Sequence, residues 1–177
     1  MPVRRKHIRS LVEQLLKKNR IQSAPIPVEE IAQSLGVSVQ KEPTDDDLSG
    51  FLYRDRKRKS AVIGVNASHS ANRQNFTIGH EIGHFLLHEG DEVHVDRGFQ
   101  IKLRSEASSK GVDVEEKESN LFAAELLMPV RFLQRDLEKI DGLDLNDEAV
   151  VAELAVKYGV STQAMTFRLA YLGYIRL

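Results

Sequence analysis

The sequence contains no cysteine and no long uninterrupted run of apolar residues. The lack of cysteine excludes a disulfide framework and a cysteine-ligated zinc site, and it fits a reducing compartment. The longest apolar runs are too short to span a bilayer, and charged residues interrupt the first turns of the chain. We therefore expect no membrane segment, no signal peptide and no membrane partner, and we predict a cytoplasmic protein.

A strong excess of charge of one sign is also lacking. The formal net charge of −1 argues against attraction of the whole protein to nucleic acid. With 177 residues and 41% hydrophobic content, the chain is long enough for one domain with a real core and a small appendage. We predict a main domain over residues 1–142, which begins with a basic helix within residues 1–22, and a small helical unit over residues 143–177.

The hydrophobic pattern predicts a mixture of helices and strands. Helical periodicity marks residues 7–19, 28–35, 72–90, 114–128 and 132–140, and strand-like segments occupy residues 37–39, 50–53 and 61–65. We interpret the basic segment 54–59 as a solvated hairpin connection and residues 91–113 as a long loop. The fold class is therefore α+β.

The most informative motif is His80-Glu81-Ile82-Gly83-His84, which has the H-E-x-x-H pattern of zinc hydrolases. On a helix, residues four apart share a face, so both imidazoles can bind one ion. Glu81 is displaced by about 100° from His80, which favours contact of its carboxylate with a metal-activated water. The motif predicts His80 and His84 as metal ligands and Glu81 as the general base.

A catalytic zinc site uses three protein ligands, so one more is needed. His88 is too far along the helix, because eight residues rise about 12 Å, whereas His94 lies in the following loop and could fold back. The acidic start of the helix at 114–128 is a better source. There, Glu116 shares a face with Asn120, which could orient a ligand histidine. We favour Glu116 and keep Glu115 and Glu118 as alternatives.

Three blocks of the chain resemble the ImmA/IrrE-type metallopeptidases. The first runs from Val65 through the histidine motif to His88, the second from Glu116 to Met128-Pro129, and the third from Leu154 to Gly173. Together they cover most of residues 24–175. Ser119 departs from the pattern, because the family more often has alanine there.

The resemblance implies a gluzincin-type peptidase in which two histidines and one glutamate hold zinc. It implies a minimal zincin-like core, made of an active-site helix, a small β-sheet and a glutamate-bearing helix, with a C-terminal unit like a helix-turn-helix. It also implies that the substrate is a helix-turn-helix repressor, whose cleavage derepresses stress-response or mobile-element genes. Mn²⁺ and Fe²⁺ remain alternatives to Zn²⁺ for the same donors.

A peptide substrate can add as a strand to an exposed sheet edge. The candidate edge comprises Ala61, Val62, Ile63, Gly64 and Val65.

The alternative function is a DNA- or protein-binding regulator with a zinc site that does not turn over. Residues 151–161 resemble the first half of a helix-turn-helix. The segment 151–175 nevertheless offers only Lys157 and Arg168 as basic residues, which is few for phosphate binding. Direct DNA binding is therefore the less favoured interpretation.

Overall fold

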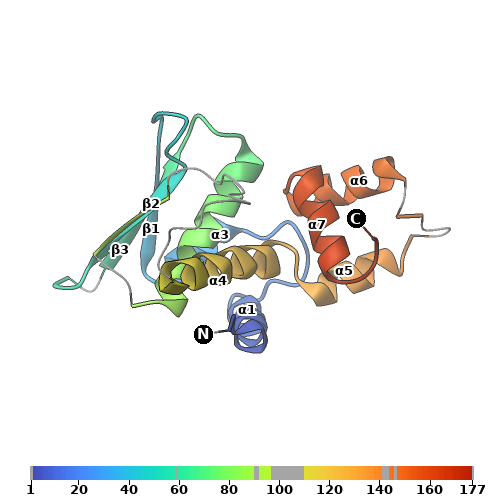
Figure 1. Ribbon diagram of the computed structural model, residues 1–177, viewed down its shortest axis with the longest axis horizontal. Helices are drawn as coiled ribbons and strands as arrows, with labels where there is room; N and C mark the ends of the chain where they lie inside the picture. The colour runs from blue at the N-terminus through green and yellow to red at the C-terminus, as the bar shows by residue number, and fades with distance from the viewer. Residues whose placement is uncertain are drawn as a thin grey trace.

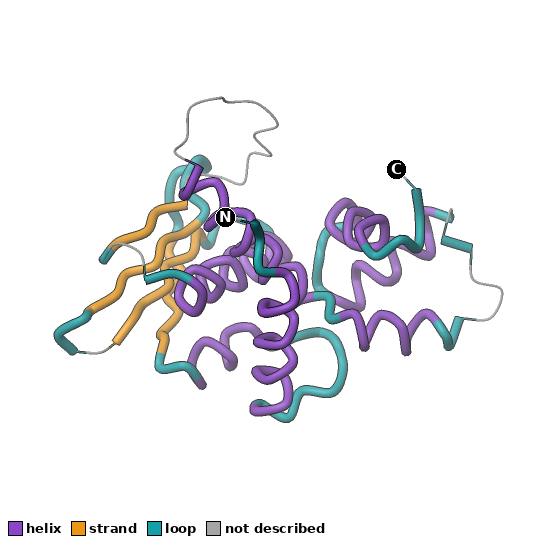
Figure 2. Tube along the Cα trace, turned by 60° about the horizontal axis from the view of Figure 1, so that its bottom comes forward, coloured by secondary structure: helices purple, strands orange, loops and turns teal. Residues whose placement is uncertain are grey.

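The computed structural model describes residues 2–58, 60–89, 92–96, 110–140, 144–145 and 147–176. Within these ranges the chain forms a mixed α+β fold, as predicted, with helices gathered on one face of a single sheet (Figures 1 and 2). The elements, in chain order, are α1 (Arg5–Lys18), α2 (Val28–Ser34), β1 (Val37–Glu42), β2 (Gly50–Asp55), β3 (Ser60–Asn66), α3 (Ala71–Leu87), β4 (Val93–Asp96), α4 (Lys110–Leu127), α5 (Val130–Leu137), α6 (Glu148–Tyr158) and α7 (Thr162–Tyr171).

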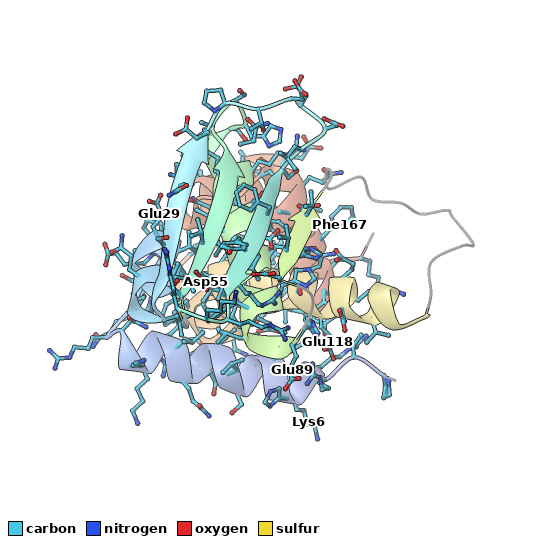
Figure 3. All side chains as sticks on the ribbon, turned by 90° about the vertical axis from the view of Figure 1, so that its left-hand side faces the viewer. Lys6, Glu29, Asp55, Glu89, Glu118 and Phe167 are labelled. Carbon is cyan, nitrogen blue, oxygen red and sulfur yellow. The ribbon has the colours of Figure 1, made fainter. Side chains whose placement is uncertain are left out.

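The sheet has the strand order β1-β3-β2-β4. The inner strand β3 runs parallel to β1 and antiparallel to β2, whereas β4 pairs antiparallel to β2. Figure 3 shows the face of this sheet that lies away from the helices. On the opposite face, alternate apolar residues such as Leu52 and Ile63 are fully buried in the core.

The predicted substrate edge at Ala61–Val65 is wrong. These residues lie in β3, which is hydrogen-bonded to β1 on one side and β2 on the other, so its backbone cannot accept a further strand. Among the described residues, the edges of the sheet are β1 and β4. The local pattern gives strand propensity but not strand order, and β3 became an inner strand through a parallel crossover to β1.

Two other interpretations of local sequence also change. Arg54, predicted to begin a solvated connection over residues 54–59, is buried, and its Nη2 donates to the carbonyl oxygen of His84 at 2.7 Å. The solvated connection is therefore shorter than predicted. The predicted loop at 91–113 contains β4, and α4 begins already at Lys110.

The basic helix α1 lies against α4 and buries one apolar stripe, formed by Ile8, Val12, Leu15 and Leu16. Two arginines at its N-terminal end also bind α4: Arg4, which immediately precedes the helix, pairs with Glu118, and Arg9 pairs with Glu125. None of the helices in the described part of the chain combines the length and apolar character needed to cross a membrane.

The last three helices, α5, α6 and α7, lie together beyond the C-terminal end of α4 (Figure 1). The turn between α6 and α7 uses Gly159 at φ +63°, and Ser161 caps α7 by accepting from the Ala164 N–H. The predicted boundary at residue 142 falls between α5 and α6. Across that boundary, the Tyr158 hydroxyl donates to Asp136 on α5 at 2.8 Å.

Candidate metal centre

Helix α3 brings the two motif histidines together on one face. The Nε2 atoms of His80 and His84 lie 3.0 Å apart, and both residues are buried. Ser70 caps the start of this helix, and Arg54 binds carbonyl groups at its end, where a cation is favourable for the helix dipole. Both ends of the helix that carries the motif are therefore fixed by side chains.

Asn120 from α4 orients one of these imidazoles. Its Oδ1 lies 2.9 Å from His80 Nδ1 and accepts a hydrogen bond from the protonated ring nitrogen. This tautomer leaves the Nε2 lone pair of His80 free for a cation, which is the usual role of such a partner. The residue predicted to orient a ligand thus lies where that role requires.

Glu116 supplies carboxylate oxygens to the same point. Its Oε1 lies 3.2 Å from His84 Nε2, and its Oε2 lies 3.5 Å from His80 Nε2. Of the alternatives, Glu115 is exposed and Glu118 accepts several hydrogen bonds from Arg4, one at 2.6 Å. The geometry brings Glu116, rather than Glu115 or Glu118, to the histidine pair.

Small residues allow α3 and α4 to approach closely enough for this arrangement. A Cβ on Gly83 would lie 3.0 Å from the Cα of Ser119, whereas one on Gly79 would make ordinary contacts of 3.4 Å with Ala123. Gly83 is therefore the tighter of the two points at which α3 crosses α4. Ser119, the residue that departs from the alanine of the family pattern, lies directly at this point.

His94 joins the cluster from β4. Its Nε2 lies 3.6 Å from Glu116 Oε1, and its ring centroid is 3.8 Å from that of His84. The donor atoms of His80, His84, His94 and Glu116 all lie within 4.8 Å of one another. His88 is absent from this group, and its Nε2 lies 3.9 Å from Glu118.

Burial keeps the imidazoles of the cluster neutral. Desolvation, with the charge of the neighbouring histidine, lowers the pKa of His80 to about 4. Desolvation also lowers the pKa of His84 to about 3 and that of His94 to about 4. Neutral imidazole is the form that binds metal, so the site is prepared for a cation rather than for protons.

Glu81 has no hydrogen-bond partner for either carboxylate oxygen among the described residues, although it is fully buried. Burial first, and then the charges of Asp96 and Glu116, raise its pKa well above the ordinary value. Asp96, at the end of β4, lies within the same small group as Glu81 and His80. Desolvation raises the pKa of Asp96 to about 6.

These features match what a divalent cation requires. Zinc ligands at about 2.0–2.1 Å in tetrahedral geometry are separated by about 3.3 Å. The Oε atoms of Glu116 lie 3.2, 3.5 and 3.6 Å from the Nε2 atoms of His84, His80 and His94, and the two α3 nitrogens are 3.0 Å apart. The Glu81 carboxylate, buried and without a hydrogen-bond partner in the described part of the chain, lies beside them, so the residues fit a metal and the water that it activates.

A groove of about 390 Å³ opens next to the centre, between α3 and α7. Its lining includes Phe76 and Thr77 of α3, Asp96 of β4, and Ala164 and Phe167 of α7. Phe167 is 45% exposed. Asp96, the last residue of β4, is part of this lining, so the groove reaches the end of that strand.

Comparison with models of known protein families shows which family the chain belongs to. The model of the M78 peptidases, described as the IrrE N-terminal-like domain, matches residues 32–170. The chain belongs to this peptidase family. The match includes every residue of the proposed centre and extends through α6 and most of α7, so the C-terminal helices are part of the family pattern.

Two curated relatives agree with this assignment. An uncharacterised immunity region protein 2 of Bacillus phage phi105 is 30% identical over 122 residues, which are 69% of this chain and 68% of that protein. The metallopeptidase ImmA of Bacillus subtilis strain 168 is 25% identical over 129 residues, 71% of this chain and 64% of ImmA.

A solved structure, titled as a Mycobacterium tuberculosis transcriptional regulator, has a TM-score of 0.63 at 16% identity and matches 93% of this chain. That likeness concerns the fold alone. The chain spans 46% of the regulator and just under two thirds of ImmA, so both relatives contain sequence beyond the shared region.

Proposed function

We propose that this protein is a zinc-dependent endopeptidase. The observation that carries the proposal is the convergence of His80, His84 and Glu116 beside the buried carboxylate of Glu81, which has no hydrogen-bond partner among the described residues. A site that only held a metal for structure would have no use for such a base next to it. The M78 family assignment supports the same conclusion.

In this proposal His80, His84 and Glu116 hold the ion, with Mn²⁺ or Fe²⁺ as alternatives to Zn²⁺. When bound, the metal supplies a Lewis acid that polarises the scissile carbonyl and lowers the pKa of water. Asn120 keeps His80 in the correct tautomer through its 2.9 Å hydrogen bond. Glu81 accepts a proton from the attacking water on its carboxylate and passes it to the leaving amine nitrogen.

We place the substrate along β4, in place of the inner strand β3. In the antiparallel ladder the Arg54 N–H donates to the Glu92 carbonyl, so the backbone N–H and C=O of His94, two residues on, also point toward β2. The backbone N–H and C=O of Val95 point away from β2, toward the open edge. A peptide paired with that edge would pass His94 and continue toward the groove at Phe167. The groove would then receive a substrate segment on one side of the cleaved bond.

The proposed substrate is a helix-turn-helix repressor, in keeping with the resemblance to ImmA/IrrE-type peptidases. The test is incubation with helix-turn-helix repressors from the same genome, beginning with any that is encoded beside this gene, with fragments identified by mass spectrometry. We expect cleavage that stops with EDTA and returns with added zinc. Cleavage that persists in EDTA would contradict a metallopeptidase, whereas no cleavage with zinc bound would reject this substrate.

The DNA-binding alternative receives little support from the charged residues of α6 and α7. Arg168 is buried and donates to Glu125 and to the Met128 carbonyl, and Lys157 pairs with Asp136 at 2.8 Å. Both basic side chains named for phosphate contact are thus engaged within the protein. We expect no salt-dependent gel shift with DNA, and a shift that Glu81→Gln leaves unchanged would favour the regulator instead.

A further inference from the structure

The imidazole of His94 is placed by the strand that carries it. His94 pairs with Leu52 of β2, and side chains on a strand alternate between the faces of the sheet. Its neighbours Val93 and Val95 are 50% and 46% exposed, whereas the side chain of His94 is 26% exposed and turns toward α3. The register of β4 therefore directs a third imidazole to the pair on α3.

The nitrogen that reaches the cluster has no other use in the described part of the molecule. His94 Nε2 is buried and has no hydrogen-bond partner among the described residues. Its distance of 3.6 Å from Glu116 Oε1 is close to the 3.5 Å that separates the same carboxylate from His80 Nε2. By its separation from Glu116, His94 is placed for a shared cation much as His80 is.

We propose that His94 is a fourth protein ligand of the metal, so that three imidazoles and the Glu116 carboxylate hold the ion in the resting protein. This inference rests on the proposed zinc site and extends it. Closed four-ligand sites are typical of structural zinc, whereas catalytic sites leave one position to water. His94 would then occupy the water position until β4 shifts, which makes the resting peptidase latent.

The position of β4 is compatible with such a shift. The strand is four residues long, and within the described residues it pairs only with β2. The same strand offers the edge on which we place the substrate. Substrate pairing with Val95 could therefore displace His94 and free the position for water in one movement, which would couple activation to binding.

The test counts imidazole ligands directly. The wild-type protein is loaded with one zinc, and X-ray absorption at the zinc edge measures the number of histidines bound. We expect three in the wild type and two in His94→Phe, which keeps the aromatic ring against His84 but removes its nitrogen donors. His88→Phe is the matched control, because that imidazole lies near His84 but outside the donor group, and it should retain three.

Zinc affinity, measured by competition with a chromophoric chelator, supplies a second readout. We expect a loss of at least about tenfold for His94→Phe and no change for His88→Phe. Two histidines in the wild type, together with equal affinities for all three proteins, would overturn the role of His94 while leaving the zinc site intact. Failure of the wild type to bind zinc at all would instead overturn the proposed function.

Discussion

At the scale of single residues, Glu81 combines full burial with two carboxylate oxygens that have no hydrogen-bond partner in the described chain. Burial of this kind is unfavourable unless a charged or polar group arrives to satisfy the carboxylate. A nearby dication and its water would do so, and the positive charge would favour the ionised base. The unfavourable position of Glu81 is therefore consistent with a catalytic role.

Glu81→Gln removes the base and keeps nearly the same shape. We expect cleavage of the proposed repressor substrate to fall by about 10²–10⁴-fold, the usual contribution of a general base, while zinc stays bound. Fragment analysis and zinc competition on the same preparation measure both quantities. Normal proteolysis by this variant would reject the assigned role, and loss of zinc would place Glu81 among the ligands.

The choice of Glu116 over Glu118 can be tested with paired variants on the same helix. Glu116→Gln removes the negative charge that faces both motif histidines. Loss of a residue that only hydrogen-bonds a metal ligand lowers metal affinity by about 10–100-fold, so we expect the loss of this proposed ligand to lower zinc affinity by at least as much. Glu118→Gln breaks the pair with Arg4 and should leave zinc affinity unchanged. Equal losses in the two variants would contradict the assignment of Glu116.

Some residues of the centre could be predicted from the sequence more directly than others, because some of their positions depend on local structure and others on tertiary contacts. His80, Glu81 and His84 follow from helical spacing, which is local. Glu116 needed an argument about a shared face with Asn120 on a second helix. The position of His94 beside them depends on the register of a four-residue strand against β2, and nothing in the local pattern fixes that register.

At the scale of elements, the contact between α3 and α4 determines whether the centre can form. Gly83→Ala would place a methyl group 3.0 Å from the Cα of Ser119, which is backbone and cannot rotate away. We expect a loss of about 1–3 kcal/mol in the free energy of unfolding, as in overpacked cores, and weaker zinc binding. Urea denaturation and zinc competition provide the measurements.

Gly79→Ala is the matched control, one helical turn away. Its methyl group would meet Ala123 at an ordinary 3.4 Å, and alanine is favoured over glycine in a helix by up to about 1 kcal/mol. This variant should therefore be neutral or stabilising. Similar destabilisation in both variants would contradict the conclusion that Gly83 is the tighter crossing point of the two helices.

The free edge of β4 can be tested through its backbone. Val95→Pro removes an N–H that points away from β2, so the sheet loses no hydrogen bond of its own. We expect substrate cleavage to fall about tenfold, consistent with the loss of a substrate hydrogen bond worth about 1.5 kcal/mol. Val95→Ala keeps the N–H and should cleave normally, and unchanged cleavage by the proline variant would remove β4 as the binding edge.

The pattern of helices and strands was largely predictable, whereas the order of strands was not. Apolar periodicity located the helix that became α3 and the segments that became β2 and β3. It missed β4, because none of its four residues is fully buried and its half-buried positions carry polar side chains, so the segment resembles a polar loop. It also misplaced the substrate edge, since strand order depends on a parallel crossover between β1 and β3 that no local pattern records.

At the scale of the whole molecule, one buried ion pair joins the C-terminal helices to the helix that carries Glu116. Arg168 of α7 contacts Glu125 of α4 at 2.8 Å and donates to the Met128 carbonyl, and both side chains are almost fully buried. A buried pair of this kind is costly to break, because Glu125 would be left with the half-exposed Arg9, at 3.1 Å, to compensate its buried charge. We propose that this contact keeps α7 beside the groove.

Arg168→Met should therefore lower the free energy of unfolding at neutral pH by about 3–5 kcal/mol. Lys157→Met is the control, because its pair with Asp136 involves a half-exposed ammonium group and should contribute at most about 1 kcal/mol. Urea denaturation of both variants and the wild type at pH 7 measures the difference. Equal losses would show that α7 is held by packing alone.

The same contact predicts how this difference changes with pH. Burial would raise the pKa of Glu125, but the hydrogen bonds and charge of Arg168, together with Arg9, lower it below its ordinary 4.5. A carboxyl group with a lowered folded pKa stabilises the fold above its unfolded pKa and loses that contribution as the pH falls through the folded value. The gap between wild type and Arg168→Met should therefore narrow from about pH 5 to about pH 3. A gap that stays constant over that range would mean that the stability supplied by Arg168 comes from its contacts with Met128 and not from the charge of Glu125.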